Sequence, residues 1–448
     1  MCDTMVVPPA VSGGSMLFAK NSDREGSEAQ AIEIRPRRMA APGSLLHATY
    51  LSLPEVYETA ATLLCRPYWM WGAEMGVNEH GMAIGNEAVF SRLPPDPCPG
   101  LTGMDLVRLG LERARSADEA VNVLIALVER HGQGGDGGHS KRFHYDSAFL
   151  IADPREAFVL ECAGRHWALQ RVTETRAISN AYSIGSRFDR LSRDAKDFAR
   201  DRGWWKGQEP FDFAAAFGEP VKRWAARGRQ RAARACALIG RKPGDIVPAD
   251  LMAVLRDHGD GRPRTGALFP DAICAHASAG PIRRAAQTTM SLVAALDRHL
   301  PLIWATGGSA PCTALFRPFF IEAGMPAEEP APTAKADPAC LWWRQERLHR
   351  AVMRDHANRL AVYGPARDAL ESALCAEIEK LRDLVADRSA AERRRLLADV
   401  SRAAWDVAED ALARWTRLAE AAPILRPPGL IFRYHWHRLE RRAAARPG

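Results

Sequence analysis

The chain has 448 residues, 47% of them apolar and 26% charged, a composition typical of a globular protein with two or three domains. Its formal net charge of +7 is small for this length, and part of the excess lies in an arginine-rich stretch after residue 432. This charge alone does not indicate a nucleic-acid partner.

The cysteines and the lack of long apolar runs limit the possible compartments. Nine cysteines stand far apart, and none forms a Cys-x-x-Cys pair. The odd number and wide spacing exclude a disulfide framework and a zinc ribbon, so we expect a reducing environment. No apolar run approaches about 18 residues, and the start of the chain lacks a signal-peptide pattern. These observations predict a cytoplasmic protein without a membrane partner.

The first ninety residues read as strands separated by turns. Gly13-Gly14 marks the first turn, and residues 78–81 form a hairpin turn between two apolar runs within 67–90. The other expected strands are residues 2–7, 15–21, 31–36 and 47–53. This part of the chain predicts a strand meander.

Helices and further strands follow in alternating blocks. Apolar residues at three- and four-residue spacing predict helices at 102–114 and 116–131, followed by a glycine-rich loop. Strands are expected at 145–153, 156–164, 166–172 and 176–184, then mostly helices over 189–258, then strands at 273–278, 288–296 and 300–308. The order of sheet, helices and sheet predicts an α+β body.

The C-terminal part has a different pattern. Residues 326–340 are rich in proline and alanine and predict a connector after a body that spans 1–325. Residues 341–448 form the third segment. They are almost free of glycine up to 421, with apolar residues at helical spacing, and end in a basic tail. We therefore expect a helical appendage packed on the body.

Cys2 is the first candidate for chemistry. Removal of Met1 would make it the N-terminal residue, with a free α-amine beside its own thiol. A thiol titrates near about 8.5 and an α-amine near about 7.7–8.0, so the amine can accept the thiol proton at small cost. The competing interpretation is a small buried thiol without a function.

Polar residues near the end of the second predicted strand extend this hypothesis. Lys20, Asn21 and Asp23 follow the first turn, so they can lie beside Cys2 in an antiparallel pair. A cation beside the thiol favours the thiolate, and a carboxylate can hold the ammonium form of the amine. A solvated, charged strand end is the alternative for this segment.

Asparagine side chains are candidate donors to an oxyanion. Asn86 and Asn180 each interrupt an apolar strand, where a carboxamide needs partners. Asn78 lies in the hairpin turn, where asparagine is favoured for its backbone conformation. We therefore interpret Asn78 as a turn residue and keep the other two as site candidates.

Seven segments together resemble the secernin family. They are CDTMVV (2–7), FAKNSDRE (18–25), GVNEHGMAIGNEAVF (76–90), AISNAYSIGSRFD (177–189), TTMSL (288–292), GGSAPCTALFRPFF (307–320) and WWRQERLHR (342–350). Secernins resemble the cysteine dipeptidases among the N-terminal-nucleophile hydrolases and, more distantly, the penicillin and bile-salt amidases.

This resemblance implies a fold and a set of catalytic residues. The fold would be a four-layer αββα sandwich, and Cys2 would be the nucleophile with its α-amine as base. Asp23 matches the acid near that amine, Asn180 matches the strand asparagine near the oxyanion, and Asn86 is the best match for the second donor. Lys20 stands where the amidases have arginine, which puts a bidentate role there in doubt. Arg317 is a weak candidate for their late active-site arginine.

The leading interpretation is a cysteine amidohydrolase of dipeptidase type that acts on a small peptide or amide, without metal or organic cofactor. The alternative is a non-catalytic, secernin-like interaction protein that keeps the hydrolase fold. His435 and His437 have metal-like spacing but are interpreted as part of a solvated tail. We expect no nucleic-acid partner, and a homo-oligomer is left open.

Overall fold

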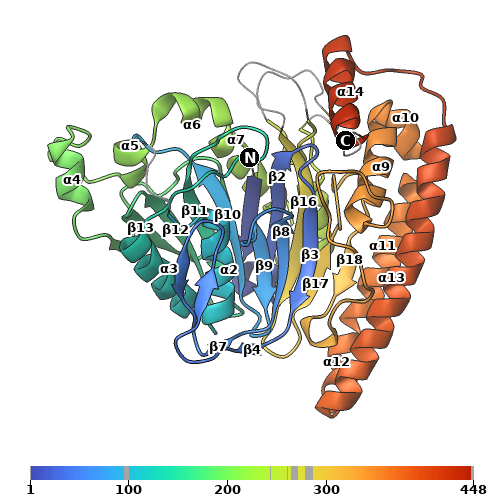
Figure 1. Cartoon of the computed structure of the whole chain (residues 1–448), viewed down its shortest axis with the longest axis horizontal. Coiled ribbons are helices and arrows are strands. Elements are labelled where there is room, and N and C mark those ends of the chain that lie inside the picture. Colours follow the sequence, from blue (N-terminus) through green and yellow to red (C-terminus); the bar gives the residue numbers. More distant parts are fainter. Residues whose placement is uncertain are drawn as a thin grey trace.

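The computed structural model describes residues 2–94, 100–242, 244–259, 261–263, 271–277 and 286–444. Two antiparallel β-sheets lie at its centre (Figure 1). One has the order β14 (Arg176–Ser179), β1 (Cys2–Val7), β2 (Met16–Glu25), β16 (Ala286–Leu296), β17 (Leu302–Ala305), β18 (Arg317–Phe319). The other has the order β15 (Arg190–Leu191), β13 (His166–Val172), β12 (Ala157–Ala163), β11 (Asp146–Ala152), β10 (Ala83–Val89), β9 (Met75–Asn78), β8 (Thr62–Pro67), β3 (Gln30–Arg35).

The two sheets pack face to face, and the alternation of side chains gives each strand one inner and one outer face. Val6 and Phe18 point into the space between the sheets and share one core with Leu150 and Val159 of the opposite sheet. Met5, one residue before Val6, belongs instead to the core on the outer face. The same alternation places the side chain of Cys2 on the inner face of β1.

Helices cover both outer faces of the sandwich. Helices α2 (Gly103–Arg113) and α3 (Ala117–His131) pack on the eight-stranded sheet. Helices α7 (Gly228–Ile239) and α8 (Pro248–Leu255) pack on the six-stranded sheet. The structure is therefore the expected four-layer αββα sandwich.

Shorter elements connect these layers. They are α1 (Pro9–Ser12), α4 (Ala195–Asp201), α5 (Phe213–Phe217), α6 (Pro220–Ala226), the 3₁₀ turn η1 (Ile321–Ala323), and the two-stranded pairs β4 (Arg38–Met39) with β7 (Glu58–Thr59) and β5 (Leu45–His47) with β6 (Ser52–Pro54).

The C-terminal helices stand along one side of the body, next to β18 (Figure 1). They are α9 (Leu341–Met353), α10 (His356–Ala361), α11 (Gly364–Glu379), α12 (Leu381–Val385), α13 (Ala390–Ala421) and α14 (Leu430–Ala444). Trp342 of α9 and Trp415 of α13 belong to the same core cluster as the space between the sheets. The helices therefore continue the core of the body. Within the described ranges, no helix is both long and apolar enough to cross a membrane.

Three local expectations were wrong. Residues 47–53 do not form one strand, because a turn closed from Ala48 to Leu51 folds them into the β5–β6 hairpin. Residues 273–277 form no strand, because their backbone bonds to separate groups of Asn21, Asp257 and Thr288 and not to one continuous partner strand. The basic tail is helical, and its Trp436 is buried.

Candidate functional site

Cys2 begins the second strand of the six-stranded sheet, with neighbours on both sides. It pairs with Ser22 of β2, and only 5% of its surface is exposed. Its backbone nitrogen donates to Asn180 Oδ1 at 2.9 Å, and its Sγ accepts from the Asp23 amide at 3.3 Å. The backbone nitrogen and the Sγ of Cys2 are therefore bound by Asn180 and Asp23, two residues that the sequence analysis named.

Asp23 and Asn21 lie on the outer face of β2, opposite to Lys20, because strand side chains alternate. Asp23 Oδ1 accepts a hydrogen bond from Thr288 Oγ1 at 2.7 Å. The Asn21 carboxamide donates to the carbonyl oxygens of Leu255 and Ile273. Asn21 therefore binds the backbone at Leu255 and Ile273 on the outer face of the sheet and does not lie beside the thiol.

Lys20 is buried between the sheets, on the same face as Cys2. Its Nζ donates to the backbone oxygen of Asn86 at 2.6 Å and lies 3.5 Å from Glu87 Oε1, both on β10 of the opposite sheet. Gly85 leaves the room for this contact, because a Cβ there would lie 2.6 Å from Lys20 Cδ. Lys20 thus links the two sheets at the site.

The Asn86 side chain is held by Glu74. With its amide nitrogen facing acceptors, Asn86 donates to the Glu74 backbone oxygen at 3.0 Å and to Glu74 Oε2 at 3.1 Å. The same Oε2 lies 3.9 Å from Cys2 Sγ, while Oε1 pairs with Arg24 at 3.1 Å. Asn86 could therefore donate to an oxyanion only if its side chain released Glu74 and then bound the substrate.

Asn180 and Arg231 form a polar network behind the start of β1. Arg231 of α7 donates to Asn180 Oδ1 at 2.6 Å and holds both carboxylate oxygens of Asp3 at 3.1 Å. Asn180 Nδ2 donates to the Ala88 oxygen on β10 at 2.9 Å. Asn180 thus fixes the nitrogen of Cys2 and connects the two sheets.

Asn78 lies away from this group, as the sequence indicated. Its Oδ1 accepts from the His80 and Met82 amides, and its Nδ2 donates to the Leu111 and Ala114 carbonyls. It therefore closes the hairpin turn and caps the end of α2.

Burial dominates the electrostatics of the site. It raises the pKa of Cys2 to about 12, and the opposing effect of Lys20 is smaller. Burial favours the neutral form of Lys20, yet its acidic neighbours, Cys2 first, raise its pKa above the ordinary value. Burial likewise raises the pKa of Glu87 to about 8. At neutral pH the Cys2 side chain is therefore a thiol, and any attack by its sulfur would need a base.

Sequence reasoning missed three charged residues of this site. Glu87 carried a signal, since an acid inside an apolar strand needs a buried partner. Glu74 precedes its strand, and Arg231 is one of several arginines in a helical segment, so neither stood out. Arg317, the weak candidate for a late arginine, pairs with Glu409 of α13 instead. The catalytic roles of the residues that do come together stay predictions.

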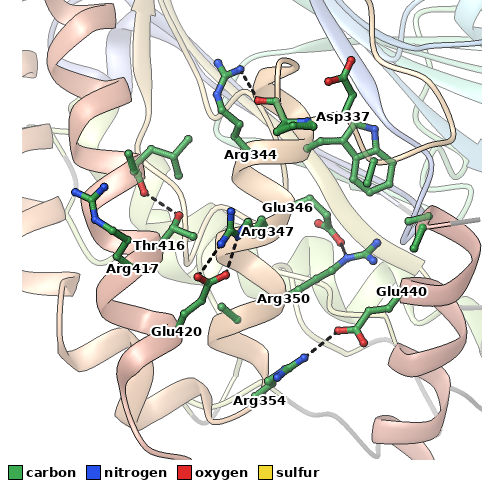
Figure 2. A pocket seen from close by; sticks show the side chains of 18 of the residues that line it. Asp337, Arg344, Glu346, Arg347, Arg350, Arg354, Thr416, Arg417, Glu420 and Glu440 are labelled. Carbon is green, nitrogen blue, oxygen red and sulfur yellow. Dashed lines mark hydrogen bonds and ion pairs between the residues drawn. The ribbon is translucent and has the colours of Figure 1, made fainter. Parts of the chain in front are cut away.

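A cavity of about 880 Å³ lies elsewhere, between α9, α13 and α14. Figure 2 shows that most of its charged side chains are paired, for example Arg347 with Glu420, Arg350 with Glu346 and Arg354 with Glu440. None of the site residues around Cys2 lines it. Among the described residues that line it, the charged side chains are therefore mostly held in ion pairs.

Comparisons with known proteins give one family and several solved structures that resemble this chain in part. The model of peptidase family C69 matches residues 1–231. A C2A mutant of conjugated bile acid hydrolase from Clostridium perfringens is 11% identical, with a TM-score of 0.42 over 71% of this chain and 92% of that one. Penicillin V acylase from Agrobacterium tumefaciens is 15% identical, with a TM-score of 0.42 over 71% of this chain and 86% of that one.

Proposed function

Because the chain belongs to peptidase family C69, which includes the secernins and dipeptidase-like cysteine N-terminal hydrolases, we propose that it is a cysteine dipeptidase or small-amide hydrolase. The membership makes it a hydrolase of C–N bonds in peptides or amides. The proposal adds the active form, which begins at Cys2 after removal of Met1, and the roles of the residues around it.

The observation that carries the proposal is the environment of Cys2. Its nitrogen is bound by Asn180, and its Sγ accepts from the Asp23 amide in a buried group of charges. In the chain with Met1 attached, that nitrogen is an amide and cannot accept a proton. Once Met1 is removed, the same nitrogen becomes an amine that Asn180 and Asp23 can orient.

Attack begins with proton transfer inside Cys2. The thiol proton moves to the α-amine while Sγ forms a bond to the substrate carbonyl carbon. Lys20 stabilises negative charge on the sulfur, and Asp23 stabilises the ammonium that results. Asn86, Asn180 and a backbone amide are the proposed donors to the oxyanion, with Asn86 released from Glu74 when substrate binds.

Collapse of the tetrahedral intermediate breaks the C–N bond. The ammonium of Cys2 returns its proton to the leaving amine, and a thioester remains on Sγ. Water then attacks the thioester, the amine takes one proton from that water, and the acid product leaves with the thiol restored. The cycle needs no oxidant or cofactor.

The proposal includes a small peptide or amide as substrate and a reducing, cytoplasmic compartment. Free thiols at all eight described cysteines support that compartment. A homo-oligomer is compatible with the proposal, and neither a nucleic acid nor a membrane is part of it.

Intact mass and N-terminal sequencing of the purified protein provide the test, together with a dipeptide panel. We expect Met1 to be absent, Cys2 to be unmodified, and Cys2→Ala to abolish hydrolysis with an unchanged melting temperature. Cys2→Ser should retain little activity, because a hydroxyl is a poorer nucleophile beside a weak amine base. Cys65→Ser, at a buried cysteine of β8, is the matched control.

The alternative is a secernin-like interaction protein that keeps the fold without catalysis. The high burial of Cys2 and the raised pKa of its thiol are the features that favour it. Retained Met1 together with no hydrolysis of any dipeptide would support this alternative. A large fall in melting temperature in both Cys2 variants would instead identify the thiol as a packing residue.

A further inference from the structure

Four buried side chains outside the proposed catalytic group gather at one point. They are His258, Cys274, His276 and Cys312, and one donor atom from each lies within 4.8 Å of all the others. His258 follows α8, Cys274 and His276 lie in the irregular segment 273–277, and Cys312 follows β17. The fold therefore brings together two imidazoles and two thiols from distant parts of the chain.

We propose that these four residues bind one zinc ion in a closed, structural site. Two cysteines and two histidines are a donor set that zinc prefers, and four protein ligands leave no position for substrate. Both thiols lose their protons to solvent when the ion binds, so the site carries no net charge with neutral imidazoles.

The three distances from His276 Nε2 match the edges of a tetrahedron around one ion, and the remaining pairs of donor atoms lie within 4.8 Å. Ordinary Zn–N and Zn–S bonds give edges of about 3.3 Å between two nitrogens and about 3.6 Å between nitrogen and sulfur. His276 Nε2 lies 3.0 Å from His258 Nε2, 3.4 Å from Cys312 Sγ and 3.6 Å from Cys274 Sγ. Small adjustments would therefore place all four donors at bonding distance from a common centre.

A second layer of contacts orients His276. Glu346 Oε2 lies 3.2 Å from His349 Nδ1, and His349 Nε2 lies 3.0 Å from His276 Nδ1. With the Glu346 carboxylate accepting a hydrogen bond from His349 Nδ1–H, His349 Nε2 is the acceptor for His276 Nδ1–H. That tautomer leaves the lone pair of His276 Nε2 directed at the other three donors, as in carboxylate–histidine–zinc arrangements.

The zinc site would connect the C-terminal helices to the segment 273–277, which supports one of the proposed catalytic residues. His349 and Glu346 belong to α9, and Glu346 also pairs with Arg350 at the cavity of Figure 2. On the other side, the Ala275 amide donates to Thr288 Oγ1, which donates in turn to Asp23. Zinc would therefore fix the segment that supports Asp23.

Metal analysis of the full chain is the direct experiment. Protein made in zinc-supplemented medium and purified under reducing conditions without chelator should contain one zinc ion per chain. Cys312→Ser should lose this zinc, and Cys375→Ser, a half-buried cysteine of α11, should keep it. His349→Ala should bind zinc about 10–100-fold more weakly in competition with a chromophoric chelator.

Cobalt provides a readout that does not depend on the variants. After chelation and addition of cobalt, the wild-type chain should show thiolate-to-metal charge-transfer bands and tetrahedral d–d bands. Zinc-free protein without such bands would overturn the proposal, as would zinc retained in Cys312→Ser. A disulfide between Cys274 and Cys312, detected as a loss of two hydrogen masses under reducing purification, would also overturn it.

Discussion

At the residue scale, substitution of Asp23 distinguishes a catalytic role of this carboxylate from a purely structural one. Asp23→Asn keeps the backbone amide that donates to Cys2 Sγ but removes the charge that would hold the ammonium. We expect kcat to fall by about 100-fold or more, in the range of general acid–base contributions. The measurement is dipeptide hydrolysis at saturating substrate.

Glu25→Gln is the matched control for this prediction, since it removes a carboxylate from the end of the same strand. We expect it to change kcat only slightly. Equal, small effects of the two substitutions would mean that Asp23 has a structural role in the outer layer.

Glu87 is expected to make stability depend on pH. Burial raises its pKa from the ordinary value of 4.5 to about 8, so the folded chain binds a proton that the unfolded chain has released. Its contribution is present in full below the unfolded pKa and is lost as pH rises through 8. Glu87 contributes at most about 5 kcal/mol to the free energy of unfolding in this way, because each pKa unit represents about 1.36 kcal/mol.

Glu87→Gln should remove this dependence. Relative to wild type, its free energy of unfolding should rise between pH 4.5 and 8 and then level off. Urea unfolding of both proteins across this range tests the prediction. A constant difference between them would show that Glu87 is ionised in the folded protein throughout.

At the scale of elements, the site depends on the close approach of β2 and β10. A Cβ at Gly85 would lie 2.6 Å from Lys20 Cδ and 3.1 Å from Phe18 Cζ. Gly85→Ala should therefore separate the strands, at a cost of about 1–3 kcal/mol, and displace Lys20. We expect a lower melting temperature and a loss of activity.

Gly14→Ala is the control, because a Cβ there has no neighbour within 4 Å. It should leave both melting temperature and activity unchanged. Full activity in Gly85→Ala would show that the position of Lys20 is not critical.

Most elements could be predicted because their signals are local. Short β-type runs on either side of the Gly13-Gly14 turn mark β1 and β2. The capping serine Ser116 marks the start of α3, where it accepts from the Glu119 amide. The strand expected at 273–277 did not form, because this backbone bonds to separate groups of Asn21, Asp257 and Thr288, all more than ten residues away in the chain. Because side chains alternate along a strand, Asn21 and Asp23 lie on the face of β2 opposite to Lys20.

The site itself was only partly predictable. Cys2 and Asp23 stood out by position relative to the chain start and first turn, and Asn86 and Asn180 stood out because each interrupts an apolar strand. Arg231 and the donors of the proposed zinc site could not be found from spacing, since residues between 258 and 312 meet only through the tertiary fold. Spacing rules detect sites whose ligands lie in one hairpin or helix.

At the scale of the whole molecule, the C-terminal helices are expected to be required for folding. Trp342 of α9 is 1% exposed, and its Nε1 donates to the Thr289 oxygen on β16. Each large apolar side chain buried in this way contributes about 1.5–3 kcal/mol, so a few of them equal the net stability of about 5–15 kcal/mol. A chain that ends at Ala339 should therefore aggregate or lose cooperative unfolding.

A chain that ends at Pro428 is the matched control, because it lacks α14 and keeps α9 to α13. Size-exclusion chromatography, circular dichroism and dipeptide hydrolysis compare the two truncations. The longer chain should stay folded with a lower melting temperature, since Trp436 no longer covers Ala277 and His349. If the chain ending at Ala339 were monodisperse and fully active, the helices would be an independent partner-binding module, which favours the interaction-protein alternative. Aggregation of the shorter chain alone would place α9 to α13 within the core that holds the two sheets together, and so make them part of the enzyme.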